Sequence, residues 1–149
     1  MAESVSVQVE RASSATPAAV YDVLMDVERW AEWMPHASAA SWEKHGAPDT
    51  GLGGIRRVGK GFNVTRDHIV AGTRPTHHAY AASTPRWMLI KDYRGDVRIE
   101  ETESGSLIIW TVTCTPRIRA LTRVFNLQLQ SVYTRIAAAL AREAERIGR

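Results

Sequence analysis

The C-terminal segment is the part of the sequence that most limits the possible folds. Apolar residues recur every three or four positions from 118 to 147, with one slot of the stripe held by Glu143. They are Ile118, Leu121, Phe125, Leu129, Val132, Ile136, Leu140 and Ile147. This spacing predicts one amphipathic helix about 45 Å long. Because such a helix gains most of its stability from packing its apolar face, we expect it to lie across a large sheet.

The middle of the chain predicts that sheet. Short β-favouring runs alternate there with Gly, Pro, Asp and Asn. We expect strands at 39–46, 52–59, 62–71, 77–84, 88–100 and 106–115. The short connections between them favour antiparallel order. In the last run, Ile108, Trp110, Val112 and Cys114 share one strongly apolar face, which indicates a strand buried on one side.

The N-terminal third predicts one more strand and two short helices. Apolar and polar residues alternate through 5–9, which is the period of a half-buried strand. Thr16 and Pro17 supply an N-cap and a first helical residue, so we expect a helix over 17–26. A second helix over 27–35 should end at its proline. The order is therefore strand, two short helices, six strands and one long helix, an α+β chain.

The composition indicates a globular protein, and the placement of the charges argues against a nucleic-acid-binding one. With 44% hydrophobic and 23% charged residues, the 149-residue chain is that of an ordinary globular protein, and we expect one domain over 1–149. The basic excess lies at the C-terminus, where seven Arg face two Glu from Arg117 onward. Four of these arginines share one side of the predicted helix: Arg135, Arg142, Arg146 and Arg149. A solvated helix face explains them better than a nucleic-acid site, because no groove-reading motif accompanies them.

The compartment is expected to be the cytoplasm. Cys114 is the single cysteine, so it forms no internal disulfide and fits a reducing environment. The N-terminus lacks the basic start and apolar run of a signal peptide. No segment approaches the ~20 apolar residues that span a bilayer, so we expect no membrane insertion.

Four stretches resemble the START-like, or SRPBCC, superfamily, especially its polyketide cyclase/dehydrase-like branch. They are the residues from Ala12 to Pro35, Gly51-Leu-Gly-Gly-Ile-Arg-Arg-Val58, Asp92-Tyr-Arg-Gly-Asp-Val97 and Gly105-Ser-Leu-Ile-Ile-Trp110. The resemblance covers essentially the whole chain and implies the helix-grip fold, in which a curved seven-stranded antiparallel sheet wraps around the C-terminal helix. It is less specific for activity, because the superfamily includes lipid carriers, hormone receptors, cyclases and oxygenase subunits.

A curved sheet that grips one helix leaves a space between them, which side chains or a ligand occupy. The resemblance implies a pocket between the concave sheet face, the first turns of the long helix and the loops around the second helix. The candidate lining residues are Trp30, Trp33, Trp42, Met88, Ile90, Tyr93, Trp110, Val112, Phe125, Leu129 and Tyr133. Ordinary core packing is the alternative for each of them.

Catalytic candidates are an arginine or tyrosine turned into that apolar space, where it could polarise a carbonyl or stabilise an enolate, as an aldol cyclase requires. The sequence offers Arg56, Arg57, Arg66, Tyr93 and Arg94. Alternation lets only one of Arg56 and Arg57 point inward, and the alternative is that all five face outward. Characterised cyclases of the branch carry a tyrosine where this chain has 36–38, and inward arginines near Ile69 and Ala82.

No metal or other cofactor is expected. None of the five histidines has a second His or Cys at zinc-like spacing, and His77 and His78 should point to opposite faces of a strand. Cys114 shares a strand face with Trp110 and Val112, which favours a buried side chain over a nucleophile.

Three functions remain open. The first, which we favour, is binding of a small hydrophobic or aromatic ligand, lipid-like or polyketide-like, without a cofactor. The second is a cyclase or dehydratase that uses a pocket Arg or Tyr. The third is a protein-interaction module that uses the basic helix face or an edge strand, and it predicts an exposed apolar patch beside Arg135 and Arg142.

Overall fold

A seven-stranded antiparallel sheet forms the main layer of the computed structural model, which describes residues 4–148. The strands follow the spatial order β1-β7-β6-β5-β4-β3-β2. Their bounds are β1 Val5–Ser13, β2 Ala40–Lys44, β3 Ile55–Val58, β4 Thr65–Thr73, β5 His77–Ser83, β6 Ile90–Thr102 and β7 Gly105–Pro116. The predicted meander is confirmed from β2 to β7, and β1 closes the other edge by pairing with β7.

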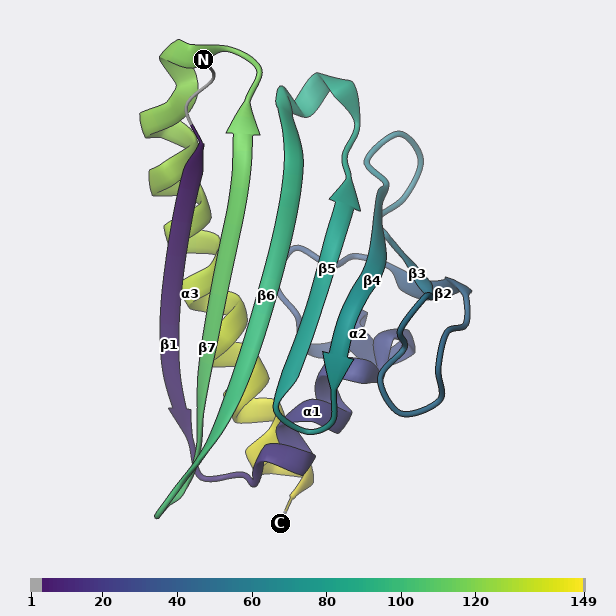
Figure 1. Ribbon diagram of the computed structural model, residues 1–149, viewed down its shortest axis with the longest axis vertical. Coiled ribbons are helices and arrows are strands. Elements are labelled where there is room, and N and C mark those ends of the chain that lie inside the picture. The colour runs from purple at the N-terminus through teal and green to yellow at the C-terminus, as the bar shows by residue number, and fades with distance from the viewer. Residues whose placement is uncertain (1–3, 149) are drawn as a thin grey trace.

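The helices lie on one face of this sheet, where α3 crosses behind β1 and β7 and ends beside α1 (Figure 1). They are α1 Pro17–Met25, α2 Trp30–Trp33 and α3 Thr122–Ile147, with the 3-10 turns η1 Val27–Arg29, η2 Arg86–Met88 and η3 Arg119–Leu121. The cap of α1 is as predicted, since the backbone N–H of Ala19 donates to Thr16 Oγ1 at 3.2 Å. Among the described helices, none is both long and apolar enough to cross a membrane.

The core fills the space between the concave face of the sheet and the helices. Every second residue of the strands points there, including the fully buried Ile108, Val112 and Val97. From α3, Leu140 and Ala144 pack against them, and Ser13 at the end of β1 donates to the carbonyl of Ala141. The predicted curved sheet around a long C-terminal helix is therefore confirmed.

The structure departs from the sequence pattern at several places, among them the strands expected at 52–59 and 62–71, which are observed as Ile55–Val58 and Thr65–Thr73. The second helix is divided into η1 and α2. The strand expected from residue 88 begins at Ile90, because η2 precedes it and Leu89 adopts a left-handed φ of 61° that breaks the strand. The apolar stripe is uncovered at its start, where Ile118 is 46% exposed, since the α-helix begins only at Thr122.

Candidate functional site

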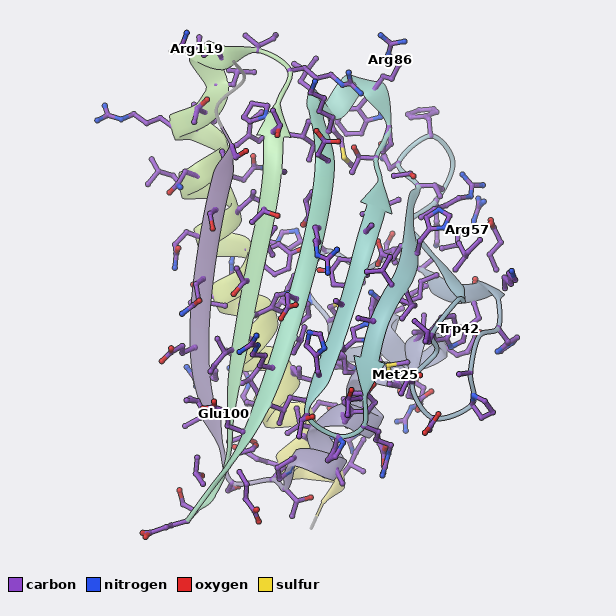
Figure 2. All side chains as sticks on the ribbon, viewed as in Figure 1. Met25, Trp42, Arg57, Arg86, Glu100 and Arg119 are labelled. Atoms are coloured by element: carbon purple, nitrogen blue, oxygen red, sulfur yellow. The ribbon has the colours of Figure 1, made fainter. Side chains whose placement is uncertain are left out.

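Strand pairing places one row of side chains across the concave face. Arg56 of β3 lies opposite Asp67 of β4, Asp67 opposite Ala82 of β5, and Ala82 opposite Tyr93 of β6. Arg56 is only 1% exposed. Its neighbour Arg57 is half-buried and belongs to the opposite face, at the β2–β3 side of the sheet where Figure 2 labels it. Arg56 is thus the inward member of the pair.

The guanidinium of Arg56 is enclosed on all sides. Its Nε and Nη2 atoms lie 3.2 and 3.1 Å from Oδ2 of Asp67, and Nη1 lies 2.8 Å from Nε2 of His78. The rings of Trp30 and Tyr80 cover it, with their centroids 4.7 and 4.8 Å from Cζ. A desolvated cation–π contact contributes about 2 kcal/mol, so paired rings and a carboxylate can hold this charge in the core.

The contact with Arg56 fixes the protonation of His78. Arginine only donates hydrogen bonds, so Nε2 of His78 accepts and the ring proton resides on Nδ1. Burial, and then the positive charge of Arg56, hold the pKa of His78 well below its usual range. Among the described residues, Nδ1 has no hydrogen-bond partner. Burial also raises the pKa of Asp67, and the charge of Arg56 opposes that effect.

Three tyrosine hydroxyls meet beside this ion pair. Trp110 Nε1 donates to Tyr80 Oη at 3.3 Å, Tyr80 Oη lies 3.3 Å from Tyr133 Oη, and Tyr133 bonds in turn to Tyr93. Burial raises the pKa of all three tyrosines well above the ordinary value, so they remain neutral donors at neutral pH. Trp110 Nε1 and the three tyrosine hydroxyls carry four donor protons, and these three hydrogen bonds use only three of them. Whichever way the hydroxyls rotate, one hydroxyl proton is not used within the cluster.

Gly95 makes room for this cluster. It pairs directly with Tyr80 across β5 and β6. A Cβ at this position would collide with the ring and hydroxyl of Tyr80, so only glycine lets the ring lie flat across β6. From the helices, Tyr133 of α3 reaches the hydroxyl cluster, and Trp30 is oriented by donation from Nε1 to the Leu24 carbonyl at 3.0 Å.

The structure brings most of the predicted lining residues together. Trp30, Tyr93, Trp110 and Tyr133 lie in one connected group with Arg56, Asp67, His78 and Tyr80. We call these eight residues the Arg–Tyr cluster. Buried Val112, Leu129 and Ile90, and half-buried Met88 and Phe125, belong to the same core.

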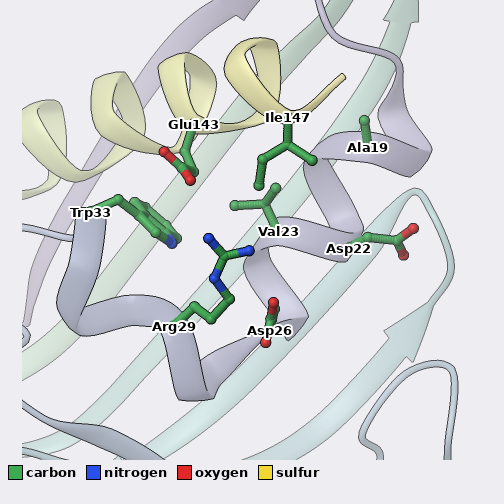
Figure 3. A pocket seen from close by; sticks show the side chains of 8 residues that line it. All are labelled: Ala19, Asp22, Val23, Asp26, Arg29, Trp33, Glu143 and Ile147. Carbon is green, nitrogen blue, oxygen red and sulfur yellow. The ribbon is translucent and has the colours of Figure 1, made fainter. Parts of the chain in front are cut away.

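Two predicted lining residues, Trp33 and Trp42, pack against the same core but outside the Arg–Tyr cluster. Trp42 of β2 packs beside His45, with ring centroids 6.1 Å apart. Trp33 lines a crevice of about 310 Å³ between α1, η1 and the end of α3, together with Arg29 and Glu143 (Figure 3). The remaining arginine candidates are exposed, Arg66 in an ion pair with Glu43 and Arg94 on the outer face.

The cluster is closed in this conformation. Besides the crevice at Trp33, hollows of about 500 and 410 Å³ lie along β5 and β6. Tyr93 borders the first of them, whereas Arg56, Tyr80 and Tyr133 line none of the three. Tyr93 is also half-buried, so it is the member of the cluster nearest to solvent access.

Sequence reasoning missed Asp67, His78 and Tyr80 as site residues. A signal for two of them exists, because steps of two from the inward Ala82 reach Tyr80 and His78. Asp67 lies two residues before Ile69, whose side chain is also buried. Within residues 4–148, no three His, Cys, Asp or Glu side chains gather as metal ligands would.

Among the described residues of α3, no large apolar side chain is exposed beside Arg135 and Arg142, where the interaction hypothesis predicts a patch. Arg135 donates to the carbonyl of Ser131 in its own helix, and Arg146 pairs with Glu143. Arg149 lies outside the described residues. The exposed large apolar side chains of α3 are near its ends, at Val124, Leu127 and Ile147.

Comparison with known proteins shows which family and which solved structures this chain resembles. A family model described as "Polyketide cyclase / dehydrase and lipid transport" matches residues 4–145. No curated protein matches the chain.

Solved structures share the fold at low sequence identity. The Zhui aromatase/cyclase from Streptomyces sp. R1128 is 18% identical, with a TM-score of 0.73 over 99% of this chain and 97% of that one. The di-domain aromatase/cyclase StfQ of the steffimycin pathway is 17% identical, with a TM-score of 0.74 over 97% of this chain, which spans 50% of StfQ. Norcoclaurine synthase from Thalictrum flavum, in complex with dopamine and hydroxybenzaldehyde, is 12% identical, with a TM-score of 0.72 over 97% of this chain and 88% of the synthase.

Proposed function

The chain belongs to the polyketide cyclase/dehydrase and lipid transport family, and from that premise we propose that it binds a small aromatic or hydrophobic ligand, lipid-like or polyketide-like, between the concave sheet and α3. Because the Arg–Tyr cluster is closed in this conformation, the ligand enters from the hollow beside Tyr93, and its binding requires the Tyr93 and Tyr133 side chains to move apart. The buried Cys114 agrees with a reducing compartment, so we place this binding in the cytosol.

The surplus hydroxyl proton is the observation that carries the proposal. The hydroxyl of half-buried Tyr93 can direct this proton into the adjoining hollow, where a ligand oxygen can accept the hydrogen bond in place of water. Tyr93 has the access to deliver it, because Tyr80 and Tyr133 are enclosed. The neighbouring surfaces are aromatic, so the structure favours a flat ligand with a carbonyl or phenolic oxygen at one end.

The first test of binding looks for a small molecule that co-purifies with the protein. Native mass spectrometry of protein purified from its own host should detect a stoichiometric small molecule that denaturation releases. For a defined probe, we use 2-naphthol and follow quenching of tryptophan fluorescence. Absence of both a co-purifying molecule and saturable 2-naphthol binding would contradict the proposal.

Matched tyrosine variants locate the site. Tyr93→Phe removes one hydroxyl and keeps the ring, so we expect 2-naphthol to bind about 2- to 10-fold more weakly. Tyr21→Phe is the control, because the hydroxyl of Tyr21 is buried outside the hydrogen-bonded cluster. An equal effect of both variants would show that Tyr93 does not contact the probe.

A cyclase or dehydratase is the second candidate, and the neutral tyrosines favour it specifically. A tyrosine with a raised pKa donates to a ketone oxygen without losing its proton, and this hydrogen bond stabilises the enolate that forms. We expect a linear poly-β-ketone thioester to form an intramolecular aldol C–C bond and to lose water, which gives an aromatic product whose absorbance is measured. Tyr93→Phe should then lower kcat more than it changes KM, and an unchanged kcat would exclude Tyr93 from catalysis.

A further inference from the structure

Three segments far apart in the sequence meet at one end of the sheet. They are 59–64 between β3 and β4, 84–91 around η2, and 117–127 at the start of α3. Trp87 Nε1 donates to the Phe62 carbonyl at 3.1 Å, and the Arg117 amide donates to the Leu89 carbonyl at 2.7 Å. Figure 1 shows η2 and the start of α3 at the same upper end, and Figure 2 labels Arg86 and Arg119 there. We call these three segments the tip surface.

Large apolar side chains on the tip surface point into solvent. They are Phe62 at 84% exposure, Leu127 at 70%, Trp87 at 57%, Val124 at 56% and Ile118 at 46%. They come from a turn, a short 3-10 helix and the start of a long helix, and the hydrogen bond from Trp87 to the Phe62 carbonyl holds two of these segments together.

The charges of the tip surface have one sign. The three segments carry Lys60, Arg86, Lys91, Arg117, Arg119 and Arg123, all exposed, and no Asp or Glu, although the exposed Asp92 directly follows Lys91 and lines the same hollow as Arg117. No carboxylate occurs between Glu103 and Glu143 at all. The elements on the tip surface therefore present apolar side chains inside a field of cations, which is complementary to an anionic surface.

We propose that the tip surface docks onto a lipid bilayer that contains anionic headgroups. Trp and Phe side chains suit the boundary between headgroups and acyl chains, and each Lys or Arg near an anionic leaflet adds attraction. The docking depends only on these exposed residues, so it holds whatever the Arg–Tyr cluster binds.

Docking would also orient the molecule. The first turns of α3 and the start of β6 would face the bilayer, with the opposite end, at the β6–β7 turn, in water. The C-terminal half of α3, with Arg135 and Arg142, would lie away from the headgroups. These two arginines supply a matched control, because they are exposed on the same helix but outside the tip surface.

The test is flotation of the purified protein with large unilamellar vesicles. Vesicles of phosphatidylcholine with phosphatidylserine should carry the protein upward, and phosphatidylcholine alone should carry much less. The double variant Arg119→Gln/Arg123→Gln should weaken binding about 25-fold, at about fivefold for each charge. Arg135→Gln/Arg142→Gln should bind as the wild type does. Raised salt should weaken binding, because it screens the attraction.

The apolar contribution is tested at Trp87. Trp87→Ser should weaken binding about tenfold or more, whereas Leu52→Ser, an exposed apolar residue outside the tip surface, should change it less than about twofold. Brominated acyl chains should quench the fluorescence of the bound wild type, and Trp87→Phe, which still binds, should lose most of that quenching.

Three results would overturn the proposal: no flotation with phosphatidylserine vesicles, equal losses in the tip and control variants, or no difference in quenching between wild type and Trp87→Phe. Binding of an acidic protein to the tip surface, with no binding to vesicles, would also overturn it and assign the surface to a protein partner. Circular dichroism of each variant confirms that the fold is retained.

Discussion

Replacing Arg56 by Met is the sharpest test of the buried cluster. Methionine retains the apolar stem but removes the contacts to Asp67 and His78 and the charge between Trp30 and Tyr80. It leaves Asp67, which is only 6% exposed, without its counter-charge. Breaking a buried pair from one side costs about 3–5 kcal/mol, so we expect the free energy of unfolding to fall by that amount at neutral pH.

The loss of stability in Arg56→Met should be larger at neutral pH than in acid. Without Arg56, the main effect that lowers the pKa of Asp67 is gone, and burial raises that pKa further above the unfolded value of about 3.9. A carboxyl with a raised folded pKa binds its proton more tightly in the folded state. Stability is therefore lost as pH rises from the unfolded pKa through the folded one. The gap between Arg56→Met and the wild type should be widest at neutral pH and narrow in acid.

Urea unfolding, monitored by tryptophan fluorescence at several pH values, measures the difference in the free energy of unfolding between the wild type and Arg56→Met. The double variant Arg56→Met/Asp67→Asn removes the buried carboxyl. Because His78 titrates in both variants, the difference between them reports Asp67 alone, and it should grow with pH and vanish in acid. A loss below about 1 kcal/mol for Arg56→Met at neutral pH, or a double variant no more stable than the single one, would refute the reasoning.

Three further predictions follow from the structure. Gly95→Ala should cost about 1–3 kcal/mol in thermal or urea unfolding, because its Cβ displaces the Tyr80 ring, and in a Tyr80→Ala background the same change should cost almost nothing. Thr16→Ala should cost about 1 kcal/mol through the lost cap of α1, and Thr16→Ser should retain most of the stability; equal losses in urea unfolding would contradict the cap. Because the pKa of His78 is lowered in the folded state, the free energy of unfolding should fall as pH drops below the unfolded pKa of about 6.5. His78→Gln, whose amide oxygen still accepts from Arg56, should flatten this dependence of stability on pH. An unchanged pH dependence in the variant would assign it to other groups.

The elements of this fold were predictable because their signals are local. The stripe from 118 to 147 indicates a helix that needs a large sheet, and the alternation around Trp110 indicates a strand buried on one face. The cap at Thr16 and the meander of short strands follow from neighbouring residues alone. The errors occurred where local pattern is silent, as at Leu89, whose left-handed φ ends η2 before β6 begins.

The composition of the site was only partly predictable. Trp30, Tyr93, Trp110 and Tyr133 were expected near one another, and alternation required that one of two adjacent arginines point inward. Alternation could not choose between them, because a shift of one residue reverses every side chain in a strand. The two-residue step from Ala82 could have placed Tyr80 and His78 on the inner face, but nothing in the sequence indicated that they and Asp67 would contact Arg56 or the tyrosine hydroxyls.

The sequence by itself therefore determined the order of elements and the long amphipathic helix, since both depend on periodicity within a short window, and the resemblance of four stretches to the START-like superfamily indicated the family of the fold. Only the tertiary structure decided that Arg56 is enclosed by Asp67, His78 and two aromatic rings, and that the tyrosines of β5, β6 and α3 share one hydroxyl cluster. The physical reason is that these contacts join residues up to 53 positions apart, such as Tyr80 and Tyr133, and depend on the pairing of strands and the placement of one helix across them.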